Sequence, residues 1–280
     1  MIRLAVNLVY GGHGATPRGK EQLSTVGKAI SLLELFGIDQ PELGLSEIAR
    51  RSGFDKATTR RLLVSLAAHG FVEQDPVARL YRLGPGLTRL ARIREARFPF
   101  LQTSLPFIRE LALSTAETIH LSEASNGSLL TVYVEHPAWA NRVNVNLGEL
   151  LPLHSTASGI AFLAHAREPL RRSALSQPLA AFTTHTITDP AAIEEAIAAA
   201  RKRGFSTSNQ GYEDGVSSVA SAILGSDGYA IGTLAVAAPL VRTTKATAAE
   251  RGEAVAAATR GITEQLTGER YDTVVRRASA

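Results

Sequence analysis

Apolar residues recur at helical spacing in the first part of the chain. From Ser24 onwards, this spacing predicts a helix with one buried face, formed by Val26, Ala29, Ile30, Leu33 and Phe36. The segment GIDQPELG interrupts the pattern, because Gly and Pro favour turns. A short second helix is expected to follow, with Ser46 as its N-cap and an end near Gly53.

A third helix is expected over residues 56–69. Asp55 can cap its first turn, and Gly70 stands where glycine commonly ends a helix. The stretches FVEQ and LYRL then read as two short strands joined by a tight loop at Asp75–Pro76. Residues 24–84 therefore predict a winged helix-turn-helix domain.

The stretch that follows is rich in arginine. It predicts a helix over residues 84–98 with Leu87, Leu90 and Ala91 on one side, and Pro99 ends this helix. We interpret it as the linker between two domains.

Beyond the linker, helical and strand patterns alternate. Helices are expected at 100–115, 155–166, 189–204 and 245–267, and strands at 118–125, 128–136, 143–147, 217–224 and 229–239. Asn126-Gly127 and Ser226-Asp227-Gly228 carry hairpin-turn signals. These elements predict an α+β domain of the ligand-sensing type, GAF- or PAS-like, with an antiparallel sheet flanked by helices.

The expected domain boundaries follow from these patterns. They are a flexible tail at 1–22, the winged helix-turn-helix at 23–84, the linker helix at 85–98, an effector-binding domain at 99–268, and a frayed tail at 269–280. A length of 280 residues agrees with two domains.

Composition narrows the class of protein. No apolar run approaches the roughly 20 residues of a membrane span, and the opening MIRLAVNLVY lacks a cleavage site, so we expect no membrane partner and no secretory signal. The absence of cysteine excludes disulfides and thiolate sites and fits a cytoplasmic location.

Charge is unevenly distributed. Residues 50–97 hold eleven Lys or Arg and four acidic residues, a net +7, which leaves −3 for the rest of a chain whose total is +4. A basic block suggests a polyanionic partner, although a solvated arginine-rich helix would give the same count.

The third helix has one face suited to the DNA major groove. Thr59, Leu62, Leu63 and Leu66 are expected to face the core, which leaves the arginines on the opposite side. Arginine can pair with guanine edges, while Thr and Ala methyl groups can contact thymine. The candidate DNA-binding residues, with Ser46 and the hairpin included for backbone contacts, are Ser46, Lys56, Ala57, Thr58, Arg60, Arg61, Arg79 and Tyr81. The alternative is that the arginines only solubilise an exposed helix.

Several segments together resemble the IclR-type family of bacterial transcriptional regulators. They are STVGKAISLLEL, LSEIARRSGFDKATTRRLLVSLAAHGFVEQDP and YRLGPGL for DNA binding, then LALSTAETIHLSE, LLPLHSTASGIAFLA, RKRGFSTSNQGYEDGVSSVASAI and GTLAVAAPLVR for the effector domain. The resemblance implies a cytoplasmic regulator that binds operator DNA as a homodimer or dimer of dimers (a homotetramer) and senses a small metabolite. A two-fold dimer would place two recognition helices one turn apart on DNA.

The resemblance also implies an effector pocket. Amides near Ala157 and Ser158, with Thr156 or Ser155 as cap, would hold a carboxylate at a helix N-terminus. The remaining positions implied are Ile160, Ser208, Ser218, Ala235 and Ala237, and several of them are apolar where the family is polar. We therefore expect a carboxylate with an aromatic or alkyl body rather than a small polar acid. The alternative is that these positions are core residues of a domain that binds nothing.

Other constellations give no support for catalysis. The histidines lack metal-ligand spacing, no G-x-S-x-G motif is present, and Glu213-Asp214-Gly215 reads as a turn. His154 is expected to be structural, and Trp139 to pack on a loop or partner. We predict no enzyme activity, no catalytic residue, no metal and no cofactor. The competing hypotheses are a hydrolase or transferase fused to a DNA anchor, and a ligand-independent DNA-binding protein. The resemblance fits a repressor or an activator.

Overall fold

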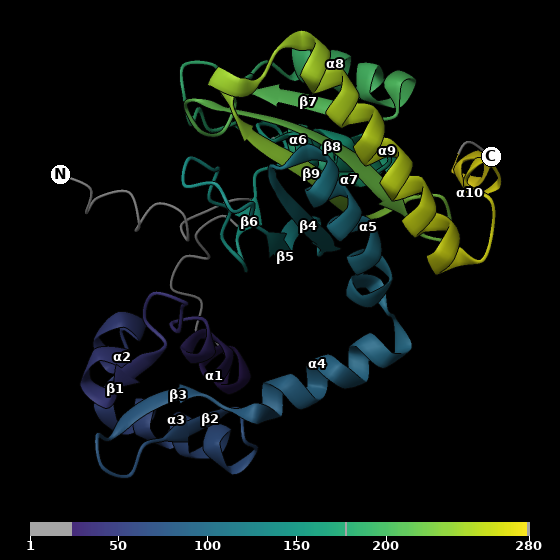
Figure 1. Cartoon of the computed structure of the whole chain (residues 1–280). Coiled ribbons are helices and arrows are strands. Elements are labelled where there is room, and N and C mark those ends of the chain that lie inside the picture. The colour runs from purple at the N-terminus through teal and green to yellow at the C-terminus, as the bar shows by residue number, and fades with distance from the viewer. Residues whose placement is uncertain (1–23, 177, 279–280) are drawn as a thin grey trace. The chain divides into compact units, whose positions relative to one another are not determined.

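The chain divides after Pro99 into two units, which are described separately. The computed structural model describes residues 24–176 and 178–278, so the predicted N-terminal tail lies outside the described residues (Figure 1). None of the helices in these two ranges has the length and apolar content that a membrane span needs.

The N-terminal unit is a winged helix-turn-helix followed by a long helix. Its elements are α1 (Thr25–Leu33), β1 (Glu42–Gly44), α2 (Leu45–Ser52), α3 (Lys56–Ala68), β2 (Val72–Gln74), β3 (Leu80–Leu83) and α4 (Pro85–Arg97). The strands form an antiparallel sheet in the order β1-β3-β2. Strand β1 falls in a segment that the sequence pattern assigned to a break between helices, and it makes β3 the central strand.

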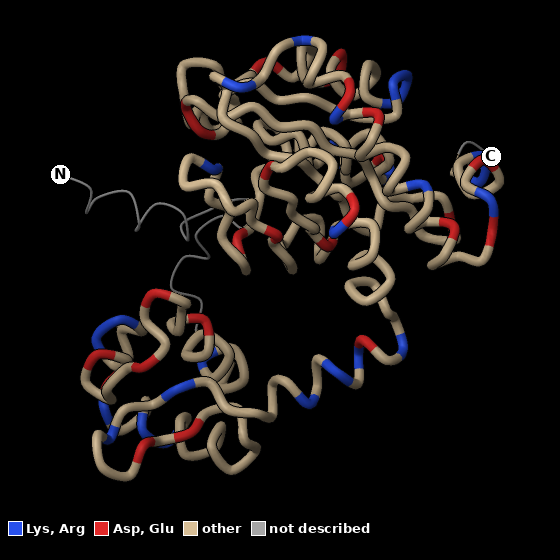
Figure 2. The backbone as a smooth tube through the Cα atoms, in the orientation of Figure 1, with Lys and Arg blue, Asp and Glu red and all other residues tan. Residues whose placement is uncertain are grey.

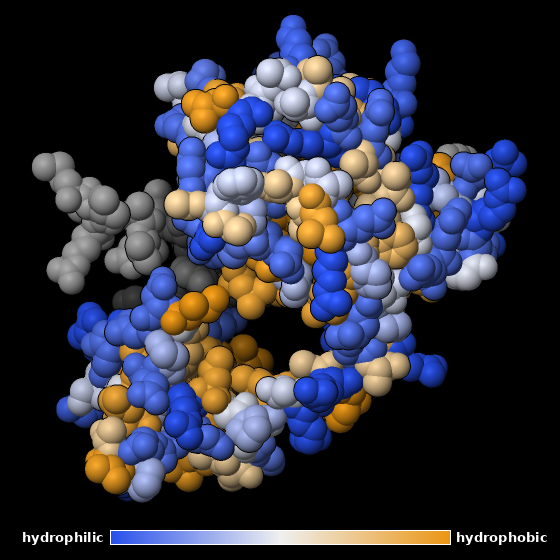
Figure 3. Space-filling model, viewed as in Figure 1, coloured by the Kyte–Doolittle hydropathy of each residue, from blue (hydrophilic) through white to orange (hydrophobic). Residues whose placement is uncertain are grey.

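The buried face of α1 differs from the predicted one. Leu32 is completely buried, whereas Val26 and Ile30 are 68% and 50% exposed. Ala29 and Leu33 do pack against the core as expected. The helix therefore has a buried apolar stripe with Ala29, Leu32 and Leu33 and an exposed one with Val26 and Ile30. The prediction treated residues of both stripes as one buried face. Figure 3 shows apolar side chains among polar ones on the visible surface of this unit.

Two glycines allow α4 to begin against the end of α3. The amide of Gly86 donates to the Gly70 carbonyl at 2.8 Å, and that of Gly84 donates to the Phe71 carbonyl at 2.8 Å. A Cβ at Gly84 or Gly86 would lie 2.3 or 2.7 Å from the Gly70 oxygen, so neither position admits a side chain without a shift. Beyond this anchor nearly all of α4 is exposed, including Leu90 and Ile93.

The C-terminal unit is a six-stranded antiparallel sheet with helices on both faces. Its elements are α5 (Phe100–Thr115), β4 (Thr118–Ser125), β5 (Ser128–Glu135), β6 (Leu150–Leu151), α6 (Ala157–Ala164), α7 (Glu168–Leu175), α8 (Pro190–Arg203), β7 (Ser206–Asn209), β8 (Val216–Leu224), β9 (Ala230–Pro239), α9 (Lys245–Thr267) and α10 (Tyr271–Arg277), with a 3₁₀ turn at Leu240–Arg242. The strand order is β6-β5-β4-β9-β8-β7. We call the side covered by α5 and α9 the outer face and the side on which α6 packs the inner face.

Residues alternate between the two faces along each central strand. On β4 and β9, Ile119, Leu121, Leu234 and Val236 join the core under α5 and α9. Because successive strand residues point to opposite faces, the residues between them belong to the inner face. On that face Ala220 and Ala235 pack against Ala157 and Ala161 of α6.

Two local predictions for this unit were wrong, and two elements were not predicted. Residues 143–147 alternate like a strand but form none, and the edge of the sheet is instead the two-residue β6. Helix α7 and strand β7 were not predicted. The supposedly frayed end forms α10, whose Val274 is completely buried against Ala222 and Leu224.

A buried carboxylate ties the end of β9 to the start of β4. Glu117 is 3% exposed, and its two oxygens accept hydrogen bonds from Arg242 at 2.8 Å and Arg251 at 3.0 Å. Arg242 also donates to the Asn141 carbonyl at 2.9 Å, which fixes the loop after β5. The charged groups therefore compensate one another where burial alone would be unfavourable.

Candidate functional site

Helix α3 presents a basic face to solvent because its apolar face is buried in the core of the unit. Thr59, Leu62, Leu63 and Leu66 are buried as predicted, and the Asp55 carboxylate accepts the Thr58 amide at 2.8 Å as N-cap. Gly53 has a φ of 72°, which turns the chain sharply between α2 and α3. The opposite side is therefore directed to solvent.

The candidate residues on α3 are accessible. Lys56, Ala57, Arg60 and Arg61 are exposed, and Thr58 is half-buried. Among residues 24–176 and 178–278, Lys56, Arg60 and Arg61 form no ion pair with an acidic side chain. These three cations are therefore available to a polyanion.

Other basic residues of the same block are engaged within the unit. Arg50 and Arg51 each bind Glu47, with closest distances of 2.6 Å, and Arg82 binds Glu73 at 3.1 Å. The +7 count from sequence thus overstates the positive charge that is free of acidic partners in this unit. Figure 2 also shows Lys and Arg recurring along α4.

Of the two candidate DNA-binding residues in the hairpin, Arg79 is accessible to DNA and Tyr81 is not. Arg79 is exposed in the loop between β2 and β3 and has a φ of 59°, and the Asp75 carboxylate accepts the amides of Val77 and Ala78. Tyr81 was predicted to reach DNA, but it is 6% exposed and belongs to the core. The pairing of β3 between β1 and β2 places its side chain inside.

Ser46 is exposed, but it is not the N-cap of α2. Gly44 holds that position, and Ser46 is the second residue of the helix. A hydroxyl in the first turn still lies beside free backbone amides, so the correction concerns its capping role and not its accessibility.

The N-terminus of α6 is built as predicted. Thr156 is the cap, since its hydroxyl accepts the Gly159 amide at 2.9 Å and donates to the Pro152 carbonyl at 2.8 Å. A Cβ at Gly159 would lie 2.2 Å from the Leu153 oxygen, so only glycine lets the preceding loop fold this tightly. Ser208 of β7 holds that loop by donating to the Ser155 carbonyl at 2.9 Å.

The register of the sheet brings most of the candidate effector residues together. Ser218 pairs with Ala237, and Ala220 pairs with Ala235, all on the inner face. Ala157 packs on Ala220 and Ala235. Ile160 does not join them, because it belongs to a separate cluster with Ile193 and Ile197 of α8.

The inner face also holds polar residues that sequence reasoning missed. Beside the alanines lie His120, Ser122, Thr131 and Thr233, each at most 6% exposed. Burial lowers the pKa of His120 to about 4, which keeps its imidazole neutral. A signal was present in the stretch TIHLS, where polar residues alternate with Ile and Leu in a strand that is buried on both faces.

His154 and Trp139 were the remaining residues singled out from the sequence. His154 Nε2 lies 2.8 Å from the Ala180 carbonyl oxygen, and its ring contacts Phe182, which in turn packs edge-on against Tyr212. The Tyr212 hydroxyl donates to Glu149 at 2.7 Å, and burial together with this contact raises the pKa of Tyr212. Trp139 is 59% exposed.

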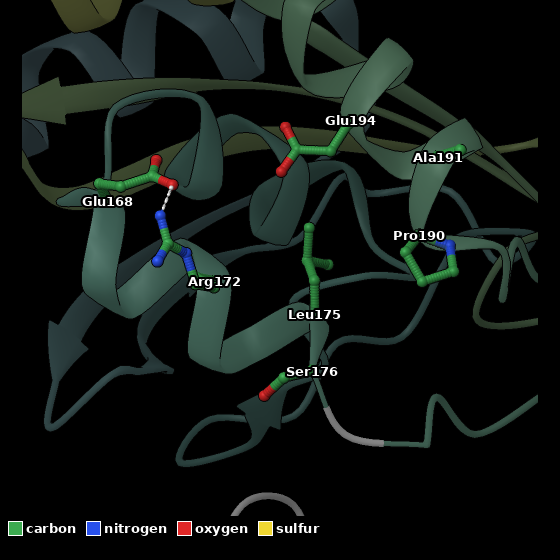
Figure 4. Close-up of a pocket in the computed structure, with 7 residues that line it drawn as sticks. All are labelled: Glu168, Arg172, Leu175, Ser176, Pro190, Ala191 and Glu194. Carbon is green, nitrogen blue, oxygen red and sulfur yellow. Dashed lines mark hydrogen bonds and ion pairs between the residues drawn. The ribbon is translucent and has the colours of Figure 1, made fainter.

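A surface pocket lies away from these residues. It has a volume of about 360 Å³ between α7 and α8 and is lined by Glu168, Arg172, Leu175, Ser176, Pro190, Ala191 and Glu194 (Figure 4). Glu168 and Arg172, four residues apart on α7, form an ion pair of 3.2 Å on one side of it. None of the predicted effector residues lines this pocket. In the part of the chain that the structure describes, no three His, Asp or Glu side chains gather as metal ligands.

Comparisons with known proteins match both units. Residues 25–76 match the IclR helix-turn-helix domain, and residues 96–264 match the C-terminal domain of the bacterial transcriptional regulator IclR. The HTH-type transcriptional regulator BhcR of Paracoccus denitrificans is 30% identical over 253 residues, which are 90% of each chain.

Solved structures agree with this assignment. A crystal structure from Silicibacter sp. TM1040, likewise assigned to the IclR regulators, is 42% identical with a TM-score of 0.77 and covers 88% of this chain and 98% of its own. An IclR homologue from Microbacterium hydrocarbonoxydans complexed with 4-hydroxybenzoate is 25% identical with a TM-score of 0.78, covering 88% of this chain and 100% of its own.

Proposed function

The chain belongs to the IclR family of bacterial transcriptional regulators, and from this premise we propose how its two units divide the work of regulation. The family consists of DNA-binding regulators with a C-terminal effector domain, and not of enzymes. We assign operator binding to residues 23–84, coupling to the helix at 85–98, and effector binding to 99–268. Because its target is the bacterial chromosome, the regulator works in the cytoplasm.

Helix α3 enters the major groove of the operator. The observation that carries this proposal is that its Lys56, Arg60 and Arg61 are exposed and unpaired while its apolar face is buried. Arg60 and Arg61 read base edges, and Lys56 contacts phosphate or base from the first turn. Ala57 lets the helix backbone approach closely.

Contacts to the DNA backbone come from the surroundings of α3. Thr58 and Ser46 bind phosphates near helix N-termini, where free amides add to the hydroxyls. Arg79 in the hairpin loop reaches the neighbouring backbone. These contacts fix the register of α3 without carrying sequence information themselves.

The protein acts as a homodimer or a dimer of dimers. One module offers few contacts, and a two-fold pair of recognition helices is the usual solution. Support comes from the apolar side chains that the N-terminal unit leaves in solvent, namely Val26 and Ile30 on α1 and Leu90 and Ile93 on α4. Burying such side chains between two copies would contribute to association.

The effector is a small carboxylate with an aromatic or alkyl body. Its carboxylate binds the amides near Ala157 and Ser158 at the N-terminus of α6, and its body lies against Ser218, Ala235 and Ala237. The relative crystallised with 4-hydroxybenzoate supports this class of ligand. A ligand that binds one arrangement of the DNA-binding units better than another shifts operator affinity, with a coupling of about 1 to 3 kcal/mol.

The DNA proposal is tested with operator sequences selected from a random pool by the full-length protein. Binding is then measured by fluorescence anisotropy at several salt concentrations. Arg60→Ala and Arg61→Ala are each expected to weaken binding by about 1 to 3 kcal/mol and to relax base preference at one position. Arg172→Ala is the charge-matched control, because Arg172 is exposed on the C-terminal unit and paired with Glu168.

Unchanged affinity and an unchanged footprint in both α3 variants would contradict the assignment of this helix. A loss of affinity in the Arg172→Ala control as large as in the α3 variants would show a general charge effect, which also contradicts sequence reading by α3.

A further inference from the structure

The inner face of the C-terminal sheet carries a row of hydroxyl groups on three adjacent strands. Ser122 of β4 pairs with Thr131 of β5 on one side and with Thr233 of β9 on the other. Paired residues in antiparallel strands direct their side chains to the same face. We call these three residues the hydroxyl row. His120 stands two residues along β4 from Ser122 and therefore faces the same side.

The polar atoms of this region lack partners. The hydroxyl groups of the row and Nδ1 of His120 are buried and form no hydrogen bond, and the same holds for the hydroxyls of Ser155 and Ser158 at the start of α6. The row residues are at most 1% exposed. A buried hydroxyl without a partner is unfavourable, so native proteins normally satisfy such groups.

Buried hydroxyls on the outer face are satisfied. Thr259 of α9 donates to Ser221 at 2.9 Å, and Ser221 donates to the Gly204 carbonyl at 2.8 Å. Thr263 accepts the Leu224 amide at 3.1 Å. On the inner face itself, Thr118 donates to the Val143 carbonyl at 2.7 Å and Ser208 to the Ser155 carbonyl at 2.9 Å. The absence of partners is therefore particular to the hydroxyl row, His120 and the start of α6, and does not apply to buried hydroxyls in this unit generally.

The hydroxyl row lies one step beyond the proposed binding site. Along β9, the inner-face residues are Ala237, Ala235 and Thr233, and successive ones are about 6.7 Å apart, two strand residues each. Ala157, at the N-terminus of α6, packs against Ala235. The start of α6 therefore lies at the middle of this run, with Ala237 on one side and Thr233 on the other. A ligand held by its carboxylate at this terminus reaches Thr233 with its far end when its body extends along β9 in the second direction.

The hydroxyl row and the inner-face residues beside it on β4 and β9 are uncharged. The inner-face positions of β4 and β9 that flank it, His120, Thr118, Ala235 and Ala237, include no acidic side chain, Lys or Arg. Burial keeps His120 neutral, since it lowers the pKa of the imidazole to about 4. A second charge on the ligand would be buried without a counter-charge, whereas a hydroxyl could both donate to and accept from this row.

We propose that Ser122, Thr131 and Thr233, with His120, form a hydrogen-bonding subsite that selects effectors with an uncharged hydroxyl remote from their carboxylate. This inference rests on the proposed function, because the carboxylate end is bound at α6. It adds the identity of the group at the opposite end.

The test compares ligands that differ by one group, by titration calorimetry on the full-length protein. The probes are benzoate, 3-hydroxybenzoate, 4-hydroxybenzoate and terephthalate, which carries a second carboxylate. We expect one of the hydroxylated acids to bind about tenfold more tightly than benzoate, and terephthalate to bind more weakly than benzoate. In the Thr233→Val and Ser122→Ala variants, the ratio of the affinity for the preferred hydroxylated acid to the affinity for benzoate should fall close to one.

Thr259→Val is the matched control, because it removes a buried hydroxyl from the outer face. It should keep the hydroxyl preference of the wild type. A second readout needs no ligand. Thr233→Val removes an unpartnered hydroxyl and should leave the melting temperature unchanged or raise it, whereas Thr259→Val breaks a hydrogen bond and should lower it.

The outcomes separate this inference from the function on which it rests. If benzoate binds and shifts operator affinity but hydroxylation adds nothing, or if the preference survives in both row variants, the subsite is refuted while the effector proposal stands. If no probe binds or changes operator affinity, the proposed effector class fails and the subsite fails with it. A large drop in melting temperature for Thr233→Val would show a structural role and would also refute the subsite.

Discussion

Burial of His120 predicts a specific loss of stability at mildly acidic pH. The pKa of this imidazole is about 4 in the folded chain against 6.5 for the solvated group, because desolvation disfavours the charged form. The folded pKa is the lower one, so the stabilisation is fully present above pH 6.5 and is lost as the pH falls towards 4. From these two values, His120 should cost about 2 kcal/mol of unfolding free energy between pH 7 and pH 5.

The assay is urea unfolding of wild type and His120→Phe at pH 7 and pH 5. The difference in unfolding free energy between the two proteins should change by about 2 kcal/mol in favour of the variant at the lower pH. His165, whose pKa burial also lowers to about 4, is present in both proteins and so cancels in the comparison. An exposed control, His185→Gln, should follow the wild type at both values.

Parallel pH dependences of wild type and His120→Phe would refute this reasoning. They would mean that His120 is solvated or acquires a partner for its proton in the folded protein, and the neutral character assigned to the inner face would then be wrong. A constant offset between the two proteins would not matter, because it reports packing of the new ring and not titration.

Three further substitutions test the framework that holds the two sites, each by urea unfolding of the full-length protein. Asp55→Ala removes the N-cap of α3 and should cost about 1 kcal/mol, while Asp55→Asn should retain most of that stability; equal losses would argue against the cap. Glu117→Gln leaves two arginines without their buried counter-charge and should cost about 3 kcal/mol, and an unchanged midpoint would show that the arginines find solvent instead. Gly159→Ala drives a Cβ into the preceding loop and should cost about 3 kcal/mol or more and abolish effector binding; normal binding would contradict the tight geometry at α6.

Helix α3 is predictable from the amino-acid sequence because its signals are local. Its cap at Asp55, its stop at Gly70 and its apolar face of Thr59, Leu62, Leu63 and Leu66 all lie within one continuous segment. The hairpin turn at Asn126-Gly127 was predictable for the same reason. The family resemblance implied Thr156 or Ser155 as the cap of α6, and the structure has Thr156. In each case the residues that decide the structure are neighbours in the chain.

The errors arose where a distant strand or helix decided the outcome. On α1, Val26 and Ile30 are as apolar as Leu32 and Leu33, and only the position of the partner helices makes one stripe the core. Tyr81 is buried because β1 arrives from an earlier segment and pairs beside it. Residues 143–147 have the alternation of a strand, but they form no ladder with a neighbouring strand.

Local signals along the chain therefore specified most of the helices, the cap of α3 and the turn at Asn126-Gly127, since these depend on hydrogen bonds and contacts within a few residues. Helices α7 and α10 and the cap of α2 were missed. Which faces became core, and the gathering of Ser122, Thr131 and Thr233 into one row, depended on strand pairing between distant segments. Pairing register is set by the packing of whole faces, a collective property that no single segment encodes. For that reason the arginines of α3 could be proposed from their spacing, whereas the polar inner face of the sheet emerged only from the assembled fold.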